Sequence, residues 1–443
     1  MKTLHEYIQA LHLGKTTSVE IVTHFLHEIQ TKDVYYNSIA SLNPRALEEA
    51  KRLDALRLDG IILSQLHGMP ILIKDNIDVI GMPNTANAFI LKDHYPKKDA
   101  PLIKILKDAG CIILGKTNLS EWAYFMSDEK MPSGYGSLHG QVIHPFNASI
   151  DPLGSSTGSA VAVAASLISI AIGTETNGSI IAPCYQNQIV GLRPTFGQLS
   201  NAGIIPISPT QDTAGPMAKT VYDLSLLYDV LTQQNITQEL SEHNKTYRVG
   251  FLNLKPFPNE KEDLHVLDTY KTILKENGHT VIDLEIPYAP VSNSETLFYE
   301  FKYSLNQYLK DAKHPVATSL ESIIDYNETN KARLLKYGQS LLIKSEKTSG
   351  DLRDPLYLQL REQLLEKASL FDQLLKEHDC DALVSTHWLP ESPIFGQPSL
   401  VYPMTLDFSN PLKSLVFIGK KHDEKTLLKL GYMIECRKKE VIN

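Results

Sequence analysis

Cysteine is scarce in this chain of 443 residues: there are four, and no two of them form a C-x-x-C pair or stand at the spacing of metal ligands. This scarcity argues against a disulfide framework and against a zinc site, and the thiols are expected to be buried residues in a reducing compartment. The histidines are scattered and form no H-E-x-x-H motif, so no metal and no other cofactor is expected.

Long apolar segments are also missing. The most apolar stretch, residues 160–172, is rich in Ala and Ser and well short of the ~20 residues that a membrane-spanning helix needs. Residues 1–16 contain His and Glu where a secretory signal would carry an uninterrupted apolar segment. The sequence therefore predicts a cytoplasmic protein with no membrane anchor.

Basic charge is not in excess either, because 43 Lys and Arg stand against 51 Asp and Glu, a formal net charge of −8. Nucleic-acid-binding proteins carry a basic face or arm, so a nucleic acid is not expected as the main partner. A small-molecule or peptide ligand is expected instead, with the protein acting as a monomer or homodimer. Hydrophobic residues make up 42%, near the globular average of roughly 45–50%, which predicts a sizeable core.

Helical and strand patterns alternate along the chain. Thr17 begins a capping box, and Asn43 and Pro44 are expected to be the cap and first residue of a second helix. The later elements are predicted as a strand at 71–73, a helix at 100–109, a strand at 111–114, a helix at 160–170, a strand at 247–252, a helix at 263–278, a strand at 280–284, a helical region at 297–378 broken near 315 and 349–355, and strands at 381–385 and 415–418. Such alternation is typical of the α/β class.

The domain organisation follows from the absence of a separating linker. No Gly/Ser-rich or Pro-rich segment is long enough to divide the chain, so residues 1–443 are predicted to form a single domain. Within it we distinguish N-terminal helices at 1–65, a central core at 66–230, and a C-terminal elaboration at 231–443 that completes the sheet and the substrate pocket.

Two segments match known motifs but lack the neighbouring secondary structure that each motif requires. Residues 110–117 fit the P-loop pattern, but a P-loop follows a strand, whereas here the middle residues are themselves a strand and a helix precedes them. Residues 154–158 fit the G-x-S-x-G nucleophile elbow, but the polar residues 147–152 before them cannot form the central strand that an elbow needs. Neither match predicts function.

Three other local features have functional potential. Lys74 ends the predicted strand at 71–73; taken alone, it could equally be a surface residue or an ion-pair partner. Residues 154–159 (GSSTGS) form a Gly/Ser loop before a helix, a pattern that also serves as a helix cap or an anion site. Residues 173–179 (GTETNGS) present a hydroxyl among backbone amides and could equally be a tight turn.

Taken together, these features resemble the amidase signature family, and within it the branch of the bacterial peptide amidases. The resemblance extends over residues 68–222 and includes four further ordered segments: 68–76 (GMPILIKDN), 115–122 (GKTNLSEW), 191–195 (GLRPT) and 211–216 (QDTAGP). It implies the amidase signature fold, an α/β architecture with a large mixed β-sheet covered by helices on both faces.

The resemblance also implies a Ser–cis-Ser–Lys triad. The acylating serine falls on Ser179, the bridging cis-serine on Ser155 and the lysine on Lys74. A lysine acts as a base only when neutral, so its reference pKa of about 10.4 has to be lowered by burial. The oxyanion hole falls on Thr176, Asn177, Gly178 and Ser179, and substrate-binding residues on Ser156, Gly134 and Tyr135.

The chain departs from the family pattern at several positions. Asn177 stands where glycine or aspartate is usual, and Ile181 replaces an arginine common in the wider family. Residues 184–188 (CYQNQ) are bulkier and more polar than usual, although Cys184 is expected to serve packing. The segment 385–419 is also short. These differences put the substrate in doubt and leave the reaction class unchanged.

Three functions stay open on the sequence alone. The first is an amide hydrolase that releases ammonia or a small amine through an acyl-serine intermediate. The second is the amidase subunit of a tRNA-dependent amidotransferase, which would generate ammonia for a partner. The third is a non-catalytic binding protein on the same fold.

Overall fold

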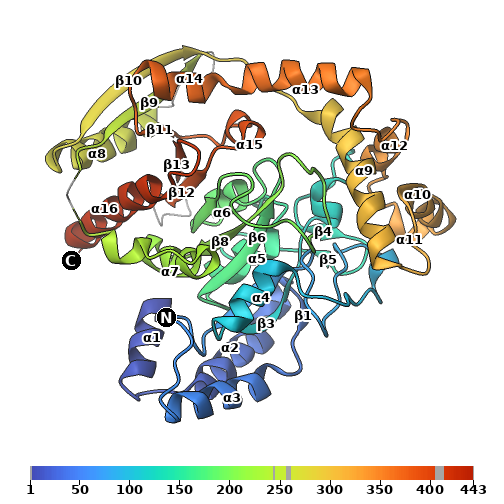
Figure 1. Cartoon of the computed structure of the whole chain (residues 1–443), viewed down its shortest axis with the longest axis horizontal. Coiled ribbons are helices and arrows are strands. Elements are labelled where there is room, and N and C mark those ends of the chain that lie inside the picture. Colours follow the sequence, from blue (N-terminus) through green and yellow to red (C-terminus); the bar gives the residue numbers. More distant parts are fainter. Residues whose placement is uncertain (1, 243–244, 256–260, 405–413, 443) are drawn as a thin grey trace.

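The computed structural model describes residues 2–242, 245–255, 261–404 and 414–442. Its described strands form one eleven-stranded mixed sheet and a separate two-stranded pair, β4–β5. The order in the large sheet is β1-β3-β2-β6-β8-β7-β12-β13-β11-β9-β10, so strands from both ends of the chain meet in one sheet (Figure 1).

The strands have the following bounds: β1 Ile39–Leu42, β2 Pro70–Lys74, β3 Ile112–Thr117, β4 Tyr135–Gly136, β5 Gly140–Gln141, β6 Ile170–Glu175, β7 Val190–Arg193, β8 Thr213–Ala218, β9 Arg248–Lys255, β10 Thr280–Pro287, β11 Ala382–Ser385, β12 Ser399–Pro403 and β13 Ser414–Gly419. The α-helices have these bounds: α1 Leu4–His12, α2 Ser18–Lys32, α3 Ala46–Leu58, α4 Pro101–Asp108, α5 Thr157–Ala164, α6 Ile181–Gln186, α7 Val221–Thr232, α8 Lys261–Glu276, α9 Ser294–Ala312, α10 Leu320–Thr329, α11 Lys331–Leu334, α12 Ser340–Glu346, α13 Pro355–Ala368, α14 Leu370–Glu377, α15 Glu391–Phe395 and α16 Glu424–Ile442.

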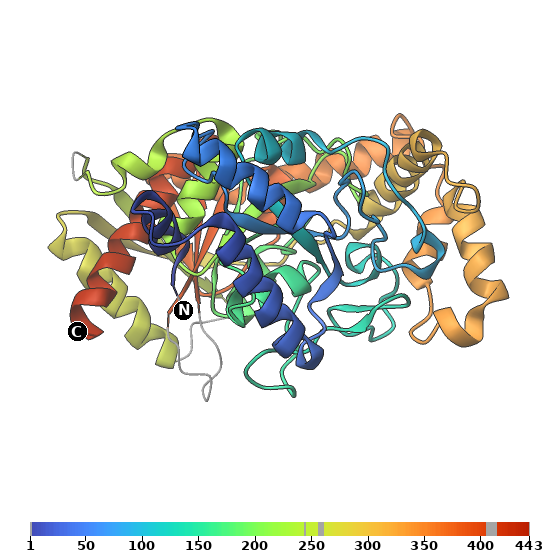
Figure 2. The same ribbon diagram turned by 90° about the horizontal axis from the view of Figure 1, so that it is seen from below.

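The centre of the sheet is buried on both faces. Every residue of β2, β3, β6, β7 and β8 is buried, as expected for strands covered by helices on both sides. Helices α5 and α6 pack against each other and the sheet, and α4, α7 and α16 form a second contacting group on it (Figure 2). The predicted α/β class, with a mixed sheet covered by helices, is confirmed.

A helical layer lies at one end of the molecule. Helices α9 to α12 gather at the end opposite α8 and α16 in both views (Figures 1 and 2). They enclose a second apolar cluster that joins Phe301 and Leu305 of α9 to Trp122 and Met126 of the core. The helical region predicted at 297–378 is thus a series of separate helices, interrupted at 313–319 and 347–354 as expected.

Two predicted helix boundaries are wrong. The helix expected at 160–170 is α5, which begins at Thr157 and ends at Ala164, because Ser166 adopts a left-handed φ of +67° and the chain turns into β6. The helix expected to be capped by Asn43 begins only at Ala46. Asn43 is instead a turn residue that accepts a bond from the Arg45 N–H and donates its side-chain amide to Ile113 O.

The rejected P-loop match is a helix, a turn and a strand, as predicted. Helix α4 is followed by β3, and Lys116 lies inside that strand, fully buried and ion-paired to Asp75 at 3.1 Å. Three cysteines are buried, as expected, but Cys436 is partly exposed. Among the described residues, no helix combines the length and apolarity that crossing a bilayer requires.

Candidate active site

Lys74 is the last residue of β2, and its parallel neighbour β6 ends with Thr174 and Glu175. Because parallel strands run in the same direction, their carboxyl ends meet at one edge of the sheet, where ligands usually bind in α/β folds. The residues after β6 therefore start next to Lys74. The sheet, rather than closeness in sequence, brings the two segments together.

The Lys74 ammonium group is enclosed by hydroxyls. Its Nζ donates to Ser155 Oγ at 2.8 Å, to Ser156 Oγ at 2.9 Å and to Thr174 Oγ1 at 2.9 Å, with the carbonyl of Thr174 at 3.2 Å. The side chain is completely buried. The alternative roles of surface residue and ion-pair partner are therefore wrong, since no carboxylate of the described residues pairs with this lysine.

Burial lowers the pKa of Lys74 to about 7, because the charged form loses its hydration. The carboxylates of Asp212 and Glu175 act in the opposite direction and raise the pKa, but less strongly. A lysine with this pKa is a substantial fraction free amine at neutral pH, and a free amine is able to accept a proton.

The loop before α5 is held tightly against β3 and β6. The peptide bond between Gly154 and Ser155 is cis, and Ser155 O accepts the N–H of Ser120 at 3.2 Å. A Cβ on Gly158 would stand 2.4 Å from the carbonyl oxygens of Asn118 and Ser38, so only glycine permits this close approach. The predicted position of the cis-serine coincides with the cis bond.

Ser179 follows β6 in a loop at residues 176–180 and is 8% exposed, whereas Ser155 and Lys74 are fully buried. Its carbonyl oxygen accepts the N–H of Ser156 at 3.1 Å, so the two serine loops are joined directly. Within the described residues, the N–H groups of Asn177, Gly178 and Ser179 donate to no protein acceptor. These donors are available for an oxygen of a ligand.

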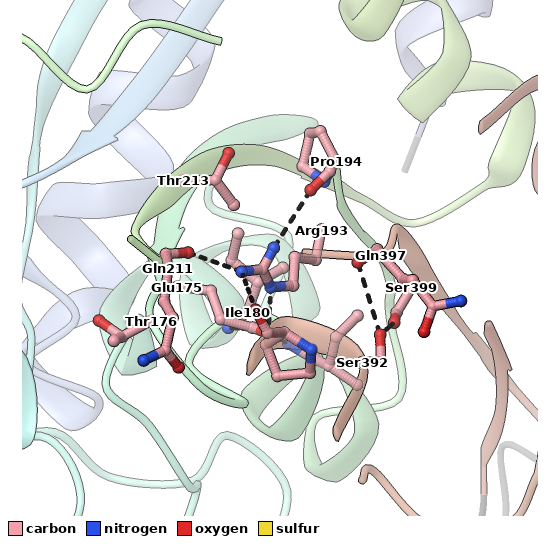
Figure 3. Close-up of polar contacts among 12 residues, drawn as sticks. Glu175, Thr176, Ile180, Arg193, Pro194, Gln211, Thr213, Ser392, Gln397 and Ser399 are labelled. Carbon is pink, nitrogen blue, oxygen red and sulfur yellow. Dashed lines mark hydrogen bonds and ion pairs between the residues drawn. The ribbon is translucent and has the colours of Figure 1, made fainter. Parts of the chain in front are cut away.

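The carboxylates of Asp212 and Glu175 hold this loop by hydrogen bonds. Thr176 donates its hydroxyl to Asp212 at 2.6 Å, and burial raises the pKa of Asp212 to about 6. Glu175 accepts the N–H groups of Ile180 and Ile181 and pairs with the buried Arg193, which Figure 3 shows between Glu175 and Gln211. The loop is thus held through the Thr176 side chain before Ser179 and through the backbone of Ile180 and Ile181 after it.

The three expected substrate-binding residues lie in different settings. Ser156 is buried, and its hydroxyl donates to Thr174 O at 2.9 Å while accepting from Lys74. The Gly134 N–H donates to Ser120 Oγ at 2.8 Å. Tyr135 is half-buried, with its ring edge-on to Tyr337 at 4.8 Å. Their contact with a substrate stays a prediction.

The departures from the family pattern fall beside the same loop. Cys184 is fully buried against Gly191, and burial raises its pKa well above the usual thiol value, so it is a packing residue as expected. The indole of Trp388 lies over Gly178, with Cδ1 3.3 Å from where a Cβ would stand. Residues 405–413 of the short 385–419 segment lie outside the described residues.

Several residues of the site were not anticipated from the sequence. Thr174 anchors Lys74, and Asn76 in turn donates to Thr174 Oγ1 at 3.0 Å. Glu175 and Arg193 are charged residues at the ends of buried apolar strands, a signal that could have revealed them. In the described part of the chain, no cluster of His, Cys, Asp or Glu has the arrangement of a metal site.

Known proteins resemble the whole chain. The family model described as Amidase matches residues 20–421. A probable amidase from Arabidopsis thaliana is 31% identical, and the match covers 98% of this chain and 89% of that protein. The X-ray structure of a peptide amidase from Stenotrophomonas maltophilia is 34% identical with a TM-score of 0.90, covering 98% of this chain and 96% of that chain.

A further resemblance is shorter. A component of the glutamyl-tRNA(Gln) amidotransferase from Lawsonia intracellularis is 37% identical over 300 residues, which cover 64% of this chain and 60% of that protein. The sequence similarity to this amidotransferase component is thus confined to part of the chain, whereas the similarity to the two amidases extends along nearly all of it.

Proposed function

Because this chain belongs to the amidase signature family, in the branch of the peptide amidases, and is an amide hydrolase acting on C–N bonds, we propose that it cleaves the carboxamide of a peptide or small amide through an acyl-enzyme on Ser179. The observation that carries this proposal is the hydrogen bond from Lys74 Nζ to Ser155 Oγ at 2.8 Å, which joins a buried base to the hydroxyl beside the Ser179 loop.

The acylation step needs a base for the Ser179 hydroxyl. As its oxygen attacks the amide carbonyl carbon, its proton passes to Ser155 Oγ while Ser155 gives its own proton to neutral Lys74. The carbonyl oxygen becomes an oxyanion and accepts the N–H groups of the 176–179 loop, each worth about 3–4 kcal/mol of barrier. Fixed donors of this kind stabilise charge without reorganising during the reaction.

The leaving group departs when the intermediate collapses. The C–N bond breaks, the nitrogen takes a proton from Ser155, and Lys74 returns one to Ser155, so ammonia or an amine leaves and Ser179 is an ester. Water then attacks the ester carbonyl and gives a proton to Ser155 while Ser155 gives its own to Lys74. As the ester bond breaks, Lys74 returns a proton to Ser155, and Ser155 gives one to the departing Ser179 Oγ. The carboxylic acid is released and the Ser179 hydroxyl is restored.

The test of the proposal is an activity screen combined with covalent labelling. The purified protein is offered peptide amides, aliphatic amides and aryl amides, and ammonia or amine release is measured. In parallel, it is treated with an aryl sulfonyl fluoride, and the modified peptide is mapped by mass spectrometry. We expect turnover of at least one amide class and a single adduct on Ser179; turnover with no adduct there would contradict the nucleophile.

The pH dependence is predicted from Lys74. Below its pKa of about 7 the amine is protonated and cannot accept a proton, so kcat/KM is expected to rise tenfold per pH unit on the acid side and level off above about pH 8. The rate of sulfonyl fluoride labelling is expected to follow the same curve. Rates that stay constant between about pH 5.5 and 8.5 would exclude Lys74 as the base.

The similarity to an amidotransferase component defines the second candidate function. A protein that generates ammonia for a partner works on a substrate delivered with that partner, so it would release little ammonia alone from simple amides. Because the similarity to the peptide amidase covers 98% of this chain and that to the amidotransferase component only 64%, we favour a hydrolase that needs no second kind of chain.

A further inference from the structure

A buried ion pair lies directly behind the loop that carries Ser179. We propose that Glu175 and Arg193 are positioning residues for acylation: together they hold the backbone on both sides of the Ser179 hydroxyl, a role that rests on the proposed function of that serine. The pair joins the end of β6 to the end of β7 and to α15, whose Pro393 lies 200 positions along the chain from Arg193.

Glu175 uses both of its carboxylate oxygens. Oε2 accepts the N–H of Ile180 at 2.7 Å and that of Ile181 at 2.9 Å, while Oε1 lies 3.1 Å from Arg193 Nε. The residue four positions before Ser179 is thereby bonded to the two residues after it. This closes the loop around the carboxylate and leaves the N–H groups of 177–179 without an acceptor among the described residues.

Arg193 fixes the other side of the pair. Its guanidinium donates to Gln211 O at 2.6 Å, to Pro194 O at 3.2 Å and to Pro393 O at 3.2 Å, in addition to the contact with Glu175 (Figure 3). A planar fork with several fixed donors reaches all of these groups at once, which a lysine ammonium on a flexible stem cannot do. The position of Glu175 therefore depends on an arginine.

The C-terminal segment that Arg193 contacts is itself anchored. The Ser392 hydroxyl shares a hydrogen bond of 2.6 Å with Ser399 and donates to Gln397 O at 3.5 Å (Figure 3). Gln397 N in turn donates to Ser392 O at 2.8 Å, which fixes the turn at the end of α15. Ser399 is also the partner of Arg193 in the β7–β12 pairing. The geometry of the Ser179 loop is thus tied to the C-terminal part of the sheet.

The desolvation cost of the Glu175–Arg193 ion pair indicates that it serves to position the loop rather than to stabilise the fold. Both side chains are essentially unexposed, at 0% and 1%, so each charge loses its hydration. A buried ion pair offsets this desolvation cost only partly, and well-packed apolar residues often give equal stability. What apolar residues cannot supply is an acceptor for the two N–H groups and a donor for the three carbonyls.

The test is the Glu175→Gln substitution. Glutamine has the same shape but one oxygen, so in either orientation its NH₂ group faces a donor, either Arg193 or the two backbone N–H groups. A displacement of a reacting group by about 1 Å lowers the rate by up to about 100-fold. We therefore expect kcat to fall about 100-fold while KM stays within about threefold. Sulfonyl fluoride labelling of Ser179 is expected to slow by a similar factor.

The matched control is Asp229→Asn. Asp229 is a buried carboxylate of α7 that accepts the N–H groups of Ile236 at 2.8 Å and Thr237 at 2.9 Å, the same type of contact away from Ser179. It is expected to lower the melting temperature with no change in kcat. If Glu175→Gln, at an equal loss of melting temperature, also keeps the wild-type kcat and labelling rate, the pair is merely structural and the inference is wrong.

A second variant covers the case in which Glu175→Gln does not fold. Arg193→Lys keeps the charge opposite Glu175 but loses the fork, and kcat is expected to fall about tenfold at unchanged KM. A wild-type kcat in folded Arg193→Lys would overturn the inference. If the wild-type protein hydrolyses no amide and Ser179 is not labelled, the proposed function is wrong. If the wild-type protein is active and the folded variants are equally active, only the inference about Glu175 and Arg193 is wrong.

Discussion

Replacing Ser179 by alanine is expected to lower kcat for amide hydrolysis by at least about 10⁴-fold, because the variant has no oxygen to form the acyl intermediate. Folding is expected to be unaffected, since the hydrogen bond that joins Ser179 to Ser156 uses the backbone carbonyl, which alanine keeps. The measurement is ammonia or amine release from the best amide of the screen, with circular dichroism to verify the fold.

Ser159→Ala is the matched control for this substitution. Ser159 is a buried serine of α5, and its hydroxyl contacts Thr117 Oγ1 at 2.7 Å and Ile172 O at 3.1 Å. Its loss is expected to cost about 1 kcal/mol of stability and to leave kcat within about threefold. Hydrolysis at the wild-type rate by Ser179→Ala would show that another group is the nucleophile.

Replacing Lys74 by methionine is expected to lower kcat by about 10³-fold or more, because the buried amine that accepts the serine proton is removed while the side-chain volume is kept. The acid limb near pH 7 is expected to disappear with it. The free energy of unfolding is expected to fall by only about 1–3 kcal/mol, since the hydroxyls of Ser155 and Thr174 each lose one partner.

Lys116→Met provides the comparison for Lys74. Lys116 is equally buried on the neighbouring strand β3, but it pairs with Asp75 and contacts neither serine loop in the described structure. Removing it leaves Asp75 as an unpaired buried charge, which costs about 3–5 kcal/mol of stability. If Lys74→Met loses more stability than Lys116→Met and keeps its kcat, Lys74 is structural and the proposed base is wrong.

Secondary structure was predictable where a single segment carries a strong pattern. The strands at 71–73 and 111–114 correspond to β2 and β3, and the helix at 100–109 corresponds to α4. β6 was missed because residues 160–172 are one continuous small and apolar run, in which only the turn at residues 165–169, with the left-handed Ser166, separates the helix from the strand. A backbone turn of that kind depends on packing rather than on composition.

The candidate site was predictable through its loops but not through its supports. Each of the loops at 154–159 and 173–179 is a single unbroken segment of the sequence, so its serines could be assigned by resemblance. Thr174, Glu175 and Arg193 act through contacts with residues far along the chain, including Pro393, 200 positions from Arg193. No local pattern specifies such a contact.

The sequence by itself determined the family of the chain and the residues on which the proposed chemistry depends, two serine loops and one lysine at a strand end. Only the tertiary structure decided that Lys74 has the environment of a base. Its amine lies 2.8 Å from a serine 81 residues away, inside a core assembled from strands of both halves of the chain, and the loss of water there brings its pKa to about 7. Desolvation is a property of everything packed around a group, so no reading of the residues beside it in the sequence can supply it.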